Sequence, residues 1–497
     1  MCRVSPRHTS PVLNLTGNAL TPGRQRSWWL REALESEEEF PSPVAASPSP
    51  LRGEGQGEGL ARDIAADVVI VGGGFTGLWT AYFLTERNPD LGVVVLEQDI
   101  CGGGPSGRNG GFASGWWDEL GGLVALYGPE AAVRACRAIA ASIGAIGDFC
   151  SRHDVDAWYR RAGYMYAITA SAHERLRDEM VDLAREAGAP EELIKLSDAE
   201  VGARCASPAF RGGAFMRDGA QVQPGRLVRG LRRVVLERGV TIHEHTPVTA
   251  LDGTRAVTAK GSVRASHAVL AVNAWGVGWP QLNRRLVAWS SYIVLTAPAP
   301  EKLKAIGWTG GELISDFRTS LRYFRTTPDG RIAFGGGGGR ARPAIDRMFT
   351  SDQRAVRETA EGFRLMFPSF ADVPIEDAWG GPIDVSPTHL PNFGRVDGQN
   401  VYYAQGYTGN GVAPTHLAGQ VLADLITGAD TDNVRLPMVN ARPRAFPPEP
   451  LRSLGAAVVR RAMIAKETAE ERGQKPGFLV TQLSRTPRRL GYLLGPE

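Results

Sequence analysis

Two glycine-rich segments have the spacing that brings a backbone close to a ligand. The first reads VVIVGGGFTG from Val68 and combines an apolar run with glycines at three fixed positions. Gly72 permits a tight exit from a strand, Gly74 lets the backbone approach a pyrophosphate, and Gly77 lets the following helix pack on the strand. The first N–H groups of that helix attract phosphate oxygens. The turn therefore predicts dinucleotide binding through Gly72, Gly74, Phe75, Thr76 and Gly77.

An acidic residue at the end of the next strand supports this interpretation. The apolar run 92–96 ends at Glu97, about 20 residues beyond the turn. A carboxylate at this place accepts hydrogen bonds from ribose hydroxyls in dinucleotide-binding folds. We therefore expect Glu97 to hold the adenosine ribose.

The second segment, CGGGPSGRNGGF, indicates which dinucleotide is bound. It begins at Cys101, directly after the Glu97 strand. A nicotinamide enzyme does not require a glycine loop there, whereas a flavin enzyme must pass the larger isoalloxazine ring along the main chain. Small residues permit this close approach. The residues expected to line the flavin are Ser106, Gly107, Arg108, Asn109, Gly110 and Gly111.

Five motifs, in a fixed order, resemble those of the D-amino-acid-oxidase-like family of FAD-dependent oxidoreductases. They are DVVIVGGGFTGLWTAYFL, LEQDICGGGPSGRNGGF, PDGRIAFGGG, WGGPIDVSPTHLPNFG and YYAQGYTGNGVAPTHLAGQVLADLITG. Within the family they are most similar to the gamma-glutamylputrescine oxidase and glycine/sarcosine oxidase branch. The resemblance covers roughly residues 62–430. It implies an α/β fold (α+β overall), with a doubly wound Rossmann-like FAD-binding domain and a second, antiparallel-sheet substrate domain over the flavin.

The resemblance also implies further cofactor contacts. Val248, in HTPVTAL, meets the adenine through its main chain. Gly409, Asn410, Gly411 and Val412 face the pyrimidine end of the ring, where a helix beginning near Gly411 stabilises the negative charge of the reduced flavin. The alternative for this last segment is an ordinary helix-entry loop. The SGRNGG loop has no cysteine or histidine, and no cysteine follows Cys205. We therefore expect non-covalent FAD.

The family implies oxidation of the carbon beside an amine, with hydride transfer to flavin N5 and hydrolysis of the resulting imine. Placement of the substrate supplies most of the catalysis. Arg325 is expected to hold a substrate carboxylate, with Tyr323 on the same strand face. His389 is a candidate acceptor of the amine proton. The alternatives are a solvated strand arginine and a core histidine, and Trp379 and Tyr407 are either pocket walls or core.

The expected partners are a small amine or amino acid and an electron acceptor, either oxygen or another oxidant. A second hypothesis is a flavin-binding subunit or sensor without turnover of its own. A nicotinamide dehydrogenase is a third and less favoured one. Flavin bleaching by an amine distinguishes the first hypothesis from the second.

Composition excludes several other classes. The chain has 497 residues and a net charge of +3 from 56 basic and 53 acidic residues, with no basic block, so we expect no nucleic-acid partner. Five widely spaced cysteines and no metal-ligand cluster predict reduced thiols and no metal site. The N-terminus lacks a continuous apolar core, so we expect a cytoplasmic protein.

We divide the chain into four parts. Residues 1–60 form an N-terminal extension that is partly disordered, apart from a short helix over 27–38. Residues 61–150, 207–280 and 373–435 form the discontinuous FAD-binding domain, and residues 151–206 and 281–372 form the substrate domain. Residues 436–497 form a helical tail, which contains an amphipathic basic helix over 452–469. We favour packing of this helix on the main body over contact with a membrane.

Overall fold

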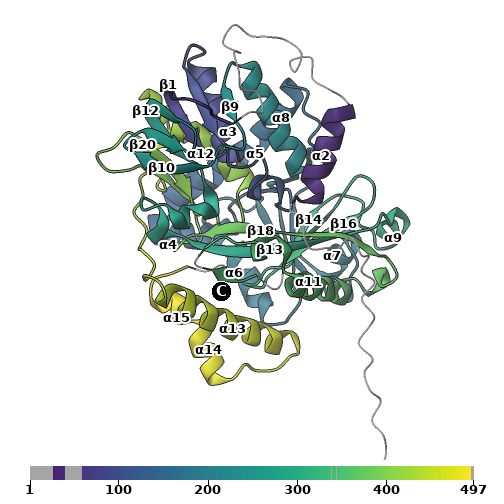
Figure 1. Cartoon of the computed structure of the whole chain (residues 1–497). Helices are drawn as coiled ribbons and strands as arrows, with labels where there is room; N and C mark the ends of the chain where they lie inside the picture. The colour runs from purple at the N-terminus through teal and green to yellow at the C-terminus, as the bar shows by residue number, and fades with distance from the viewer. Residues whose placement is uncertain (1–25, 40–58, 337–338, 343, 494–497) are drawn as a thin grey trace, which may run out of the picture.

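The computed structural model describes residues 26–39, 59–336, 339–342 and 344–493 (Figure 1). Its first sheet contains a parallel core. The order is β10 (Val248–Asp252), β11 (Arg255–Thr258), β12 (Ser262–Leu270), β1 (Ile64–Val71), β2 (Val93–Leu96) and β9 (Thr241–His243), and β20 (Val401–Gln405) joins β12 and β19 (Asn392–Arg395). β1 is parallel to β12 and β2, and its residues 68–71 are buried on both faces, as an unbroken apolar run predicts.

Helices cover one face of this sheet (Figure 1), where they pack on Val68, Ile70, Val93 and Val95. They are α3 (Phe75–Arg87), α5 (Pro129–Arg152), α8 (Pro224–Glu237) and α12 (Val412–Thr427), and α4 (Leu120–Tyr127) precedes α5. α12 packs closely on α3, where a Cβ at Gly419 would lie 2.6 Å from the Cβ of Trp79. Two segments more than 300 residues apart thus form one layer over the parallel strands.

The second sheet is largely antiparallel. Its order is β17 (Ala341–Arg342), β13 (Val287–Thr296), β16 (Ile332–Gly336), β15 (Tyr323–Thr326), β14 (Leu313–Asp316), β5 (Tyr164–Ala167), β7 (Gly213–Met216) and β6 (Leu193–Leu196), and β18 (Ile375–Val385) pairs with β13. The shorter helices are α6 (His173–Glu186), α7 (Asp198–Arg204), α9 (Pro300–Ala305), α10 (Met348–Ser351) and α11 (Gln353–Met366). A small sheet, β3 (Phe112–Ser114), β8 (Gly219–Gln221) and β4 (Arg160–Arg161), lies at the junction.

These two sheets confirm the predicted α/β class with a second, antiparallel sheet. The expected domain boundaries stay a prediction, and two strands lie on the other side of them. β7 comes from the 207–280 segment and β18 from the 373–435 segment, yet both pair within the second sheet. Pairing with distant strands decides which sheet β7 and β18 join, because the residues of each strand are equally compatible with the first sheet.

The N-terminal helix α2 (Trp28–Glu39) is part of the folded unit, although the sequence predicts an extension over residues 1–60. Trp29 and Leu30 are fully buried. Ion pairs from Glu32 to Arg226 and from Glu37 to Arg229 attach the helix to α8 (Figure 1). Trp29 makes α2 a core element, because burial of its ring removes a large apolar area from water. Residues 40–58, which the sequence predicts to be disordered, lie outside the described residues.

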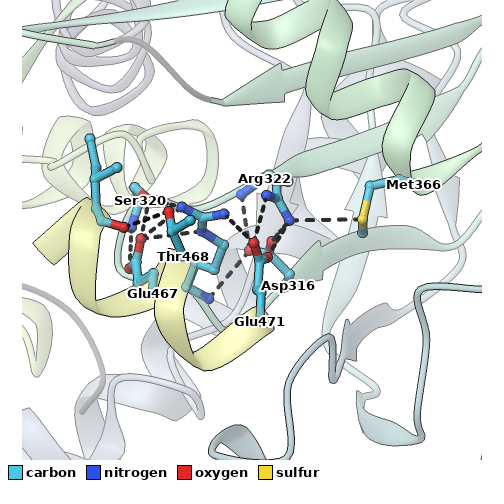
Figure 2. Close-up of polar contacts among 9 residues, drawn as sticks. Asp316, Ser320, Arg322, Met366, Glu467, Thr468 and Glu471 are labelled. Carbon is cyan, nitrogen blue, oxygen red and sulfur yellow. Dashed lines mark hydrogen bonds and ion pairs between the residues drawn. The ribbon is translucent and has the colours of Figure 1, made fainter. Parts of the chain in front are cut away.

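The C-terminal tail contains α13 (Leu451–Glu471), α14 (Phe478–Ser484) and α15 (Thr486–Arg489) and lies below the second sheet (Figure 1). α13 contains the helix predicted over 452–469. It is fixed through the loop between β14 and β15, as Figure 2 shows. Glu467 accepts from the Ser320 N–H at 3.0 Å and pairs with Arg318 at 3.0 Å. Glu471 pairs with Arg318 and with Arg322, the latter at 2.6 Å.

No described helix is long and apolar enough to cross a membrane.

Candidate active site

The first glycine turn has the geometry of a phosphate cradle. Gly72 has φ +112°, a conformation that favours glycine. A Cβ at Gly77 would lie 2.0 Å from the Gly72 carbonyl oxygen, so only glycine permits this helix–strand contact. A Cβ at Gly74 would lie 2.8 Å from the Ser106 Oγ. Gly74 is the N-cap of α3 and has no side chain to cap the helix, so the N–H groups of the first turn beyond Phe75 are left for a ligand.

The two glycine segments meet at this turn. The Ser106 Oγ accepts from the Phe75 N–H at 2.8 Å, and the Thr76 hydroxyl lies 2.8 Å from the Tyr407 hydroxyl. Side chains from two distant segments therefore contact the start of α3. A ligand that extends from the α3 N-terminus meets the second loop at Ser106.

Glu97 lies at the carboxyl end of β2, beside the turn. Its Oε2 accepts from the Gly73 N–H at 2.7 Å, and its Oε1 accepts from the Asp99 N–H at 2.9 Å. Burial raises the pKa of Glu97 to about 7. The carboxylate oxygens retain lone pairs that can accept from hydroxyl groups.

Val248, the expected adenine contact, follows closely on the same side. The Thr246 N–H donates to the Glu97 carbonyl oxygen at 2.7 Å, and β10 begins two residues later at Val248. The expected ribose and adenine contacts are therefore neighbours through the backbone.

The arginine and asparagine of the second loop shape the loop itself. The Arg108 Nε donates to the Gly103 carbonyl oxygen at 2.8 Å, and its Nη1 donates to that of Gly380 at 3.2 Å. The Asn109 amide donates to the Ser106 carbonyl oxygen at 2.8 Å and accepts from the Gly111 N–H at 2.7 Å. Both side chains therefore hold the loop in its conformation. Gly107 is buried, and its carbonyl oxygen accepts from the Ser27 hydroxyl of the segment before α2.

The third expected cofactor segment, residues 409–412, also leads into a helix that has no side-chain cap. Gly409 has φ +90°, Gly411 is the N-cap of α12 without a side-chain cap, and α12 begins at Val412. The Asn410 Oδ1 accepts from the Ser114 hydroxyl at 3.0 Å, which ties this segment to β3. The segment before α12 is thus linked to the strand that leaves the second loop, and its contact with the flavin ring stays a prediction.

Tyr323 and Arg325 extend from β15 toward the second loop, as strand alternation predicts. The Tyr323 hydroxyl lies 3.0 Å from the Ser291 Oγ, and its ring meets Phe112 edge-on at 5.6 Å. A Cβ at Gly110 would lie 3.0 Å from the Tyr323 ring. Arg322 has the opposite direction and pairs with Glu471. The second sheet therefore forms a roof directly over Gly110.

Arg325 is a buried cation with unused donors. It is 1% exposed, and burial lowers its pKa to about 9. Its Nη1 donates to the Gln221 Oε1 at 3.0 Å, and its Cζ lies 4.7 Å from the Trp29 ring. Among the described residues, its Nε and Nη2 have no hydrogen-bond partner. Such orphaned donors are rare and indicate a missing ligand or water. The expectation of a solvated arginine does not fit this burial.

Trp379 and Trp29 enclose the site from the α2 side. Trp379 is 1% exposed, and its Nε1 donates to the Arg108 carbonyl oxygen at 2.8 Å. Its ring meets that of Trp29 at 5.8 Å. Sequence reasoning missed the contribution of α2, for which the only signal was the adjacent pair Trp28 and Trp29.

His389 has a carboxylate partner that sequence reasoning also missed. Its Nδ1 lies 2.8 Å from the Glu119 Oε1, and its φ is +62°. Burial lowers the pKa of His389, but the attraction of Glu119 and Asp118 outweighs burial and leaves the pKa above its usual value. Asp118 accepts from the Tyr166 hydroxyl at 2.6 Å. The signal was WWDEL, four residues after the second loop ends.

Comparison with known proteins agrees with this arrangement. The family model for FAD dependent oxidoreductases, DAO, matches residues 67–425. The gamma-glutamylputrescine oxidoreductase of Escherichia coli is 29% identical over 379 residues, which are 74% of this chain and 85% of the relative. The sarcosine oxidase subunit beta of Rhizobium meliloti is 26% identical over 378 residues, 72% of this chain and 84% of the relative.

A solved structure shares the fold. The glycine oxidase of Geobacillus kaustophilus superposes with a TM-score of 0.63 at 20% identity, over 76% of this chain and 99% of the other. Both α2 and α13–α15 lie outside the segment that the family model matches. Because the model spans most of the chain and includes all three glycine segments, the protein belongs to the DAO family of FAD-dependent oxidoreductases.

Proposed function

We propose that this protein oxidises the C–N bond of a small amine or amino acid, with FAD bound non-covalently between the glycine segments and the second sheet. The observation that carries the proposal is the roof over the second loop: Tyr323 and the orphaned donors of Arg325 stand next to Gly110 and Gly111. A Cβ at Gly111 would lie 3.1 Å from the Arg325 Nη2. FAD binding alone would not explain why the buried Arg325 cation has no anionic partner, whereas a substrate with an anionic group would.

The residues present fit the cofactor. Gly72, Gly74 and Gly77 would hold the pyrophosphate at the α3 N-terminus, Glu97 the ribose, and Val248 the adenine. Ser106–Gly111 would follow the ring, and Gly409–Val412 would meet its pyrimidine end. FAD supplies the two-electron acceptor: a hydride leaves the substrate carbon as the nitrogen lone pair forms the C=N bond.

The side chains have the task of placing the substrate. Arg325 would bind a carboxylate through two parallel hydrogen bonds, which its free Nε and Nη2 allow. Tyr323 and Phe112 would hold the substrate carbon against the ring. His389 would accept the proton that makes the amine neutral, with Glu119 stabilising the imidazolium. The imine then takes up water and gives a carbonyl compound and an amine, and the two electrons pass to oxygen or another acceptor.

An anaerobic titration of the purified protein tests the proposal. We expect a yellow protein whose flavin absorbance is bleached by at least one amine or amino acid in a panel. We also expect FAD in the supernatant after acid precipitation. A flavin that no compound bleaches would favour the alternative, a flavin-binding subunit without turnover. Colour that stays with the precipitate would refute non-covalent binding.

A further inference from the structure

A pair of carboxylates lies at the end of the roof away from Arg325. Asp118 and Glu119 follow β3, the strand that leaves the second loop. Two contacts fix them beside the cofactor segments: Glu119 to His389 at 2.8 Å, and Ser114 of β3 to Asn410 at 3.0 Å. The pair therefore belongs to the same space as the expected pyrimidine end of the ring.

This pair lacks a permanent cation. Among the described residues, no arginine or lysine forms an ion pair with either carboxylate, and His389 is the one basic side chain in contact. The Asp118 Oδ2 accepts from Tyr166, whereas its Oδ1 is shielded from solvent and has no hydrogen-bond partner within the described ranges. Two adjacent acids with one imidazole leave excess negative charge and a free acceptor. The two residues are half-buried, but an oxygen shielded from water normally has a partner, so a cationic ligand accounts for both the charge and the free Asp118 Oδ1.

A row of aromatic rings joins this pair to the roof. Tyr323 meets Phe112 at 5.6 Å, Phe112 meets Tyr164 at 5.5 Å, Tyr164 stacks on Tyr166 at 4.3 Å, and the Tyr166 hydroxyl donates to Asp118. Such a row suits an alkyl chain, which packs on ring faces, and a cation at its end. Its two ends differ in charge, with Arg325 near one and the acids at the other.

The far side of the row is held by the C-terminal tail. Tyr166 meets Phe317 at 5.7 Å, and Phe317 forms the wall of a cavity of about 380 Å³ between α6 and α13. Phe317 begins the loop that Glu467 and Glu471 fix (Figure 2). Glu470 lines the same cavity but pairs with Lys466 at 3.3 Å. It therefore provides a carboxylate near the row that is already neutralised.

We propose that Asp118 and Glu119, oriented by Tyr166 and His389, form a subsite for a second, protonated nitrogen of the substrate. The preferred substrates are then amines that carry another cationic group along an alkyl chain. This inference rests on the proposed amine oxidation and names its substrate class. The cation would replace the missing partner of the Asp118 Oδ1 and neutralise the pair.

Two matched probes test the subsite: 1,6-diaminohexane, and 1-aminohexane, which lacks the second nitrogen. Anaerobic flavin reduction gives the apparent Kd and limiting rate for each with the wild type, Asp118→Asn, Glu119→Gln and the double variant. Removing a charge-assisted hydrogen bond costs about 1.5–3 kcal/mol, which is roughly 10- to 150-fold in affinity. We expect the wild type to prefer the diamine by about this factor. The double variant should bind both probes alike.

A second readout does not depend on turnover. Without oxygen, the diamine should raise the melting temperature of the wild type more than the monoamine does, and the double variant should lose the difference. Glu470→Gln removes a carboxylate from the adjoining cavity and should keep the wild-type preference. FAD content and circular dichroism show whether each variant is folded.

The possible results separate this inference from the proposed function. If neither probe nor any other amine or amino acid bleaches the flavin, the proposed function fails, and with it the subsite. If amines bleach the flavin but the wild type does not prefer the diamine, only the subsite fails. An equal rise in the apparent Kd of both probes in the double variant would also overturn it, because the pair would then act on the reacting nitrogen; a lower limiting rate for both probes is expected, since Glu119 also contacts His389.

Discussion

Replacing Arg325 with methionine should make the protein more stable and less active. The guanidinium is 1% exposed, and no carboxylate pairs with it among the described residues. A buried charge without a partner opposes folding, whereas an apolar side chain of similar length packs in the same space. The same charge should bind the substrate anion, so stability and activity should change in opposite directions.

The size of the effect follows from the environment of the group. Burial lowers the pKa of Arg325 from 12.5 to about 9. Because one pKa unit corresponds to about 1.4 kcal/mol, holding the charge there costs about 5 kcal/mol at neutral pH. The Trp29 ring returns about 2 kcal/mol as a desolvated cation–π pair. We therefore expect Arg325→Met to raise the free energy of unfolding by about 1–3 kcal/mol.

The pH dependence of stability gives a check on the sign of this free-energy cost. The folded-state pKa lies below the unfolded one, so the cost is present below about pH 9 and decreases as the pH rises toward 12.5. The loss of an anion partner should cost about 2–5 kcal/mol of transition-state binding. This is a fall in kcat/KM of roughly 30- to 5000-fold for substrates with a carboxylate. Amines without an anionic group should lose little.

Urea unfolding of the FAD-bound protein and steady-state kinetics measure the two effects. Arg331→Met is the matched control, because Arg331 also lies over a tryptophan of α2, with its Cζ 5.5 Å from Trp28. Unlike Arg325, it pairs with Asp329 and Glu376. The control should lose stability and keep its activity. A loss of stability in Arg325→Met, with unchanged kcat/KM for anionic substrates, would refute the reasoning and leave Arg325 a structural residue.

Three further predictions concern the cradle, the N-terminal helix and pH. Gly74→Val should abolish FAD retention, measured as the flavin-to-protein absorbance ratio, because even its Cβ would lie 2.8 Å from the Ser106 Oγ; Gly144→Val, with open space around it, should retain FAD. Trp29→Ala should lower the free energy of unfolding by about 3–5 kcal/mol and reduce activity, because the ring packs on Arg325 and Trp379; wild-type melting and kinetics would contradict a role for α2. Burial and the neighbouring Glu119 raise the pKa of Asp118 to about 7, so its contribution to stability is present below about pH 4 and is lost as the pH rises through 7. Urea unfolding of Asp118→Asn should show a smaller decline over this range, and an unchanged slope would argue against the buried carboxylate.

The N-terminal helix supports the second cofactor loop. The sequence suggests that residues 1–55 are dispensable for flavin binding, because they precede the fingerprint and are rich in proline, serine and glycine. However, Ser27 donates to the Gly107 carbonyl oxygen, and Arg31 pairs with Asp377 of β18. Deletion of α2 would expose Arg325 and remove the support of the second loop. We now predict that the truncated protein loses flavin.

The cofactor segments could be predicted from the sequence because their requirements are local. A turn that must approach phosphate excludes side chains at fixed positions, and the spacing of Gly72, Gly74 and Gly77 records this directly. The buried parallel strand and the uncapped α12 are also read from short segments. The same local logic gave the face shared by Tyr323 and Arg325, since strand residues alternate.

The tertiary structure alone decided which distant residues surround the substrate space. Asp118 and Glu119 look like ordinary helix-entry acids until His389, about 270 residues away, meets Glu119. Trp29 belongs to the site only because α8 and β18 hold α2 against it. Such contacts depend on the packing of whole helices and strands, which follows from the total burial of apolar surface. They therefore produce no characteristic residue spacing in the sequence. The sequence thus predicted the cofactor, and the packing determined which charged side chains lie at the proposed substrate site.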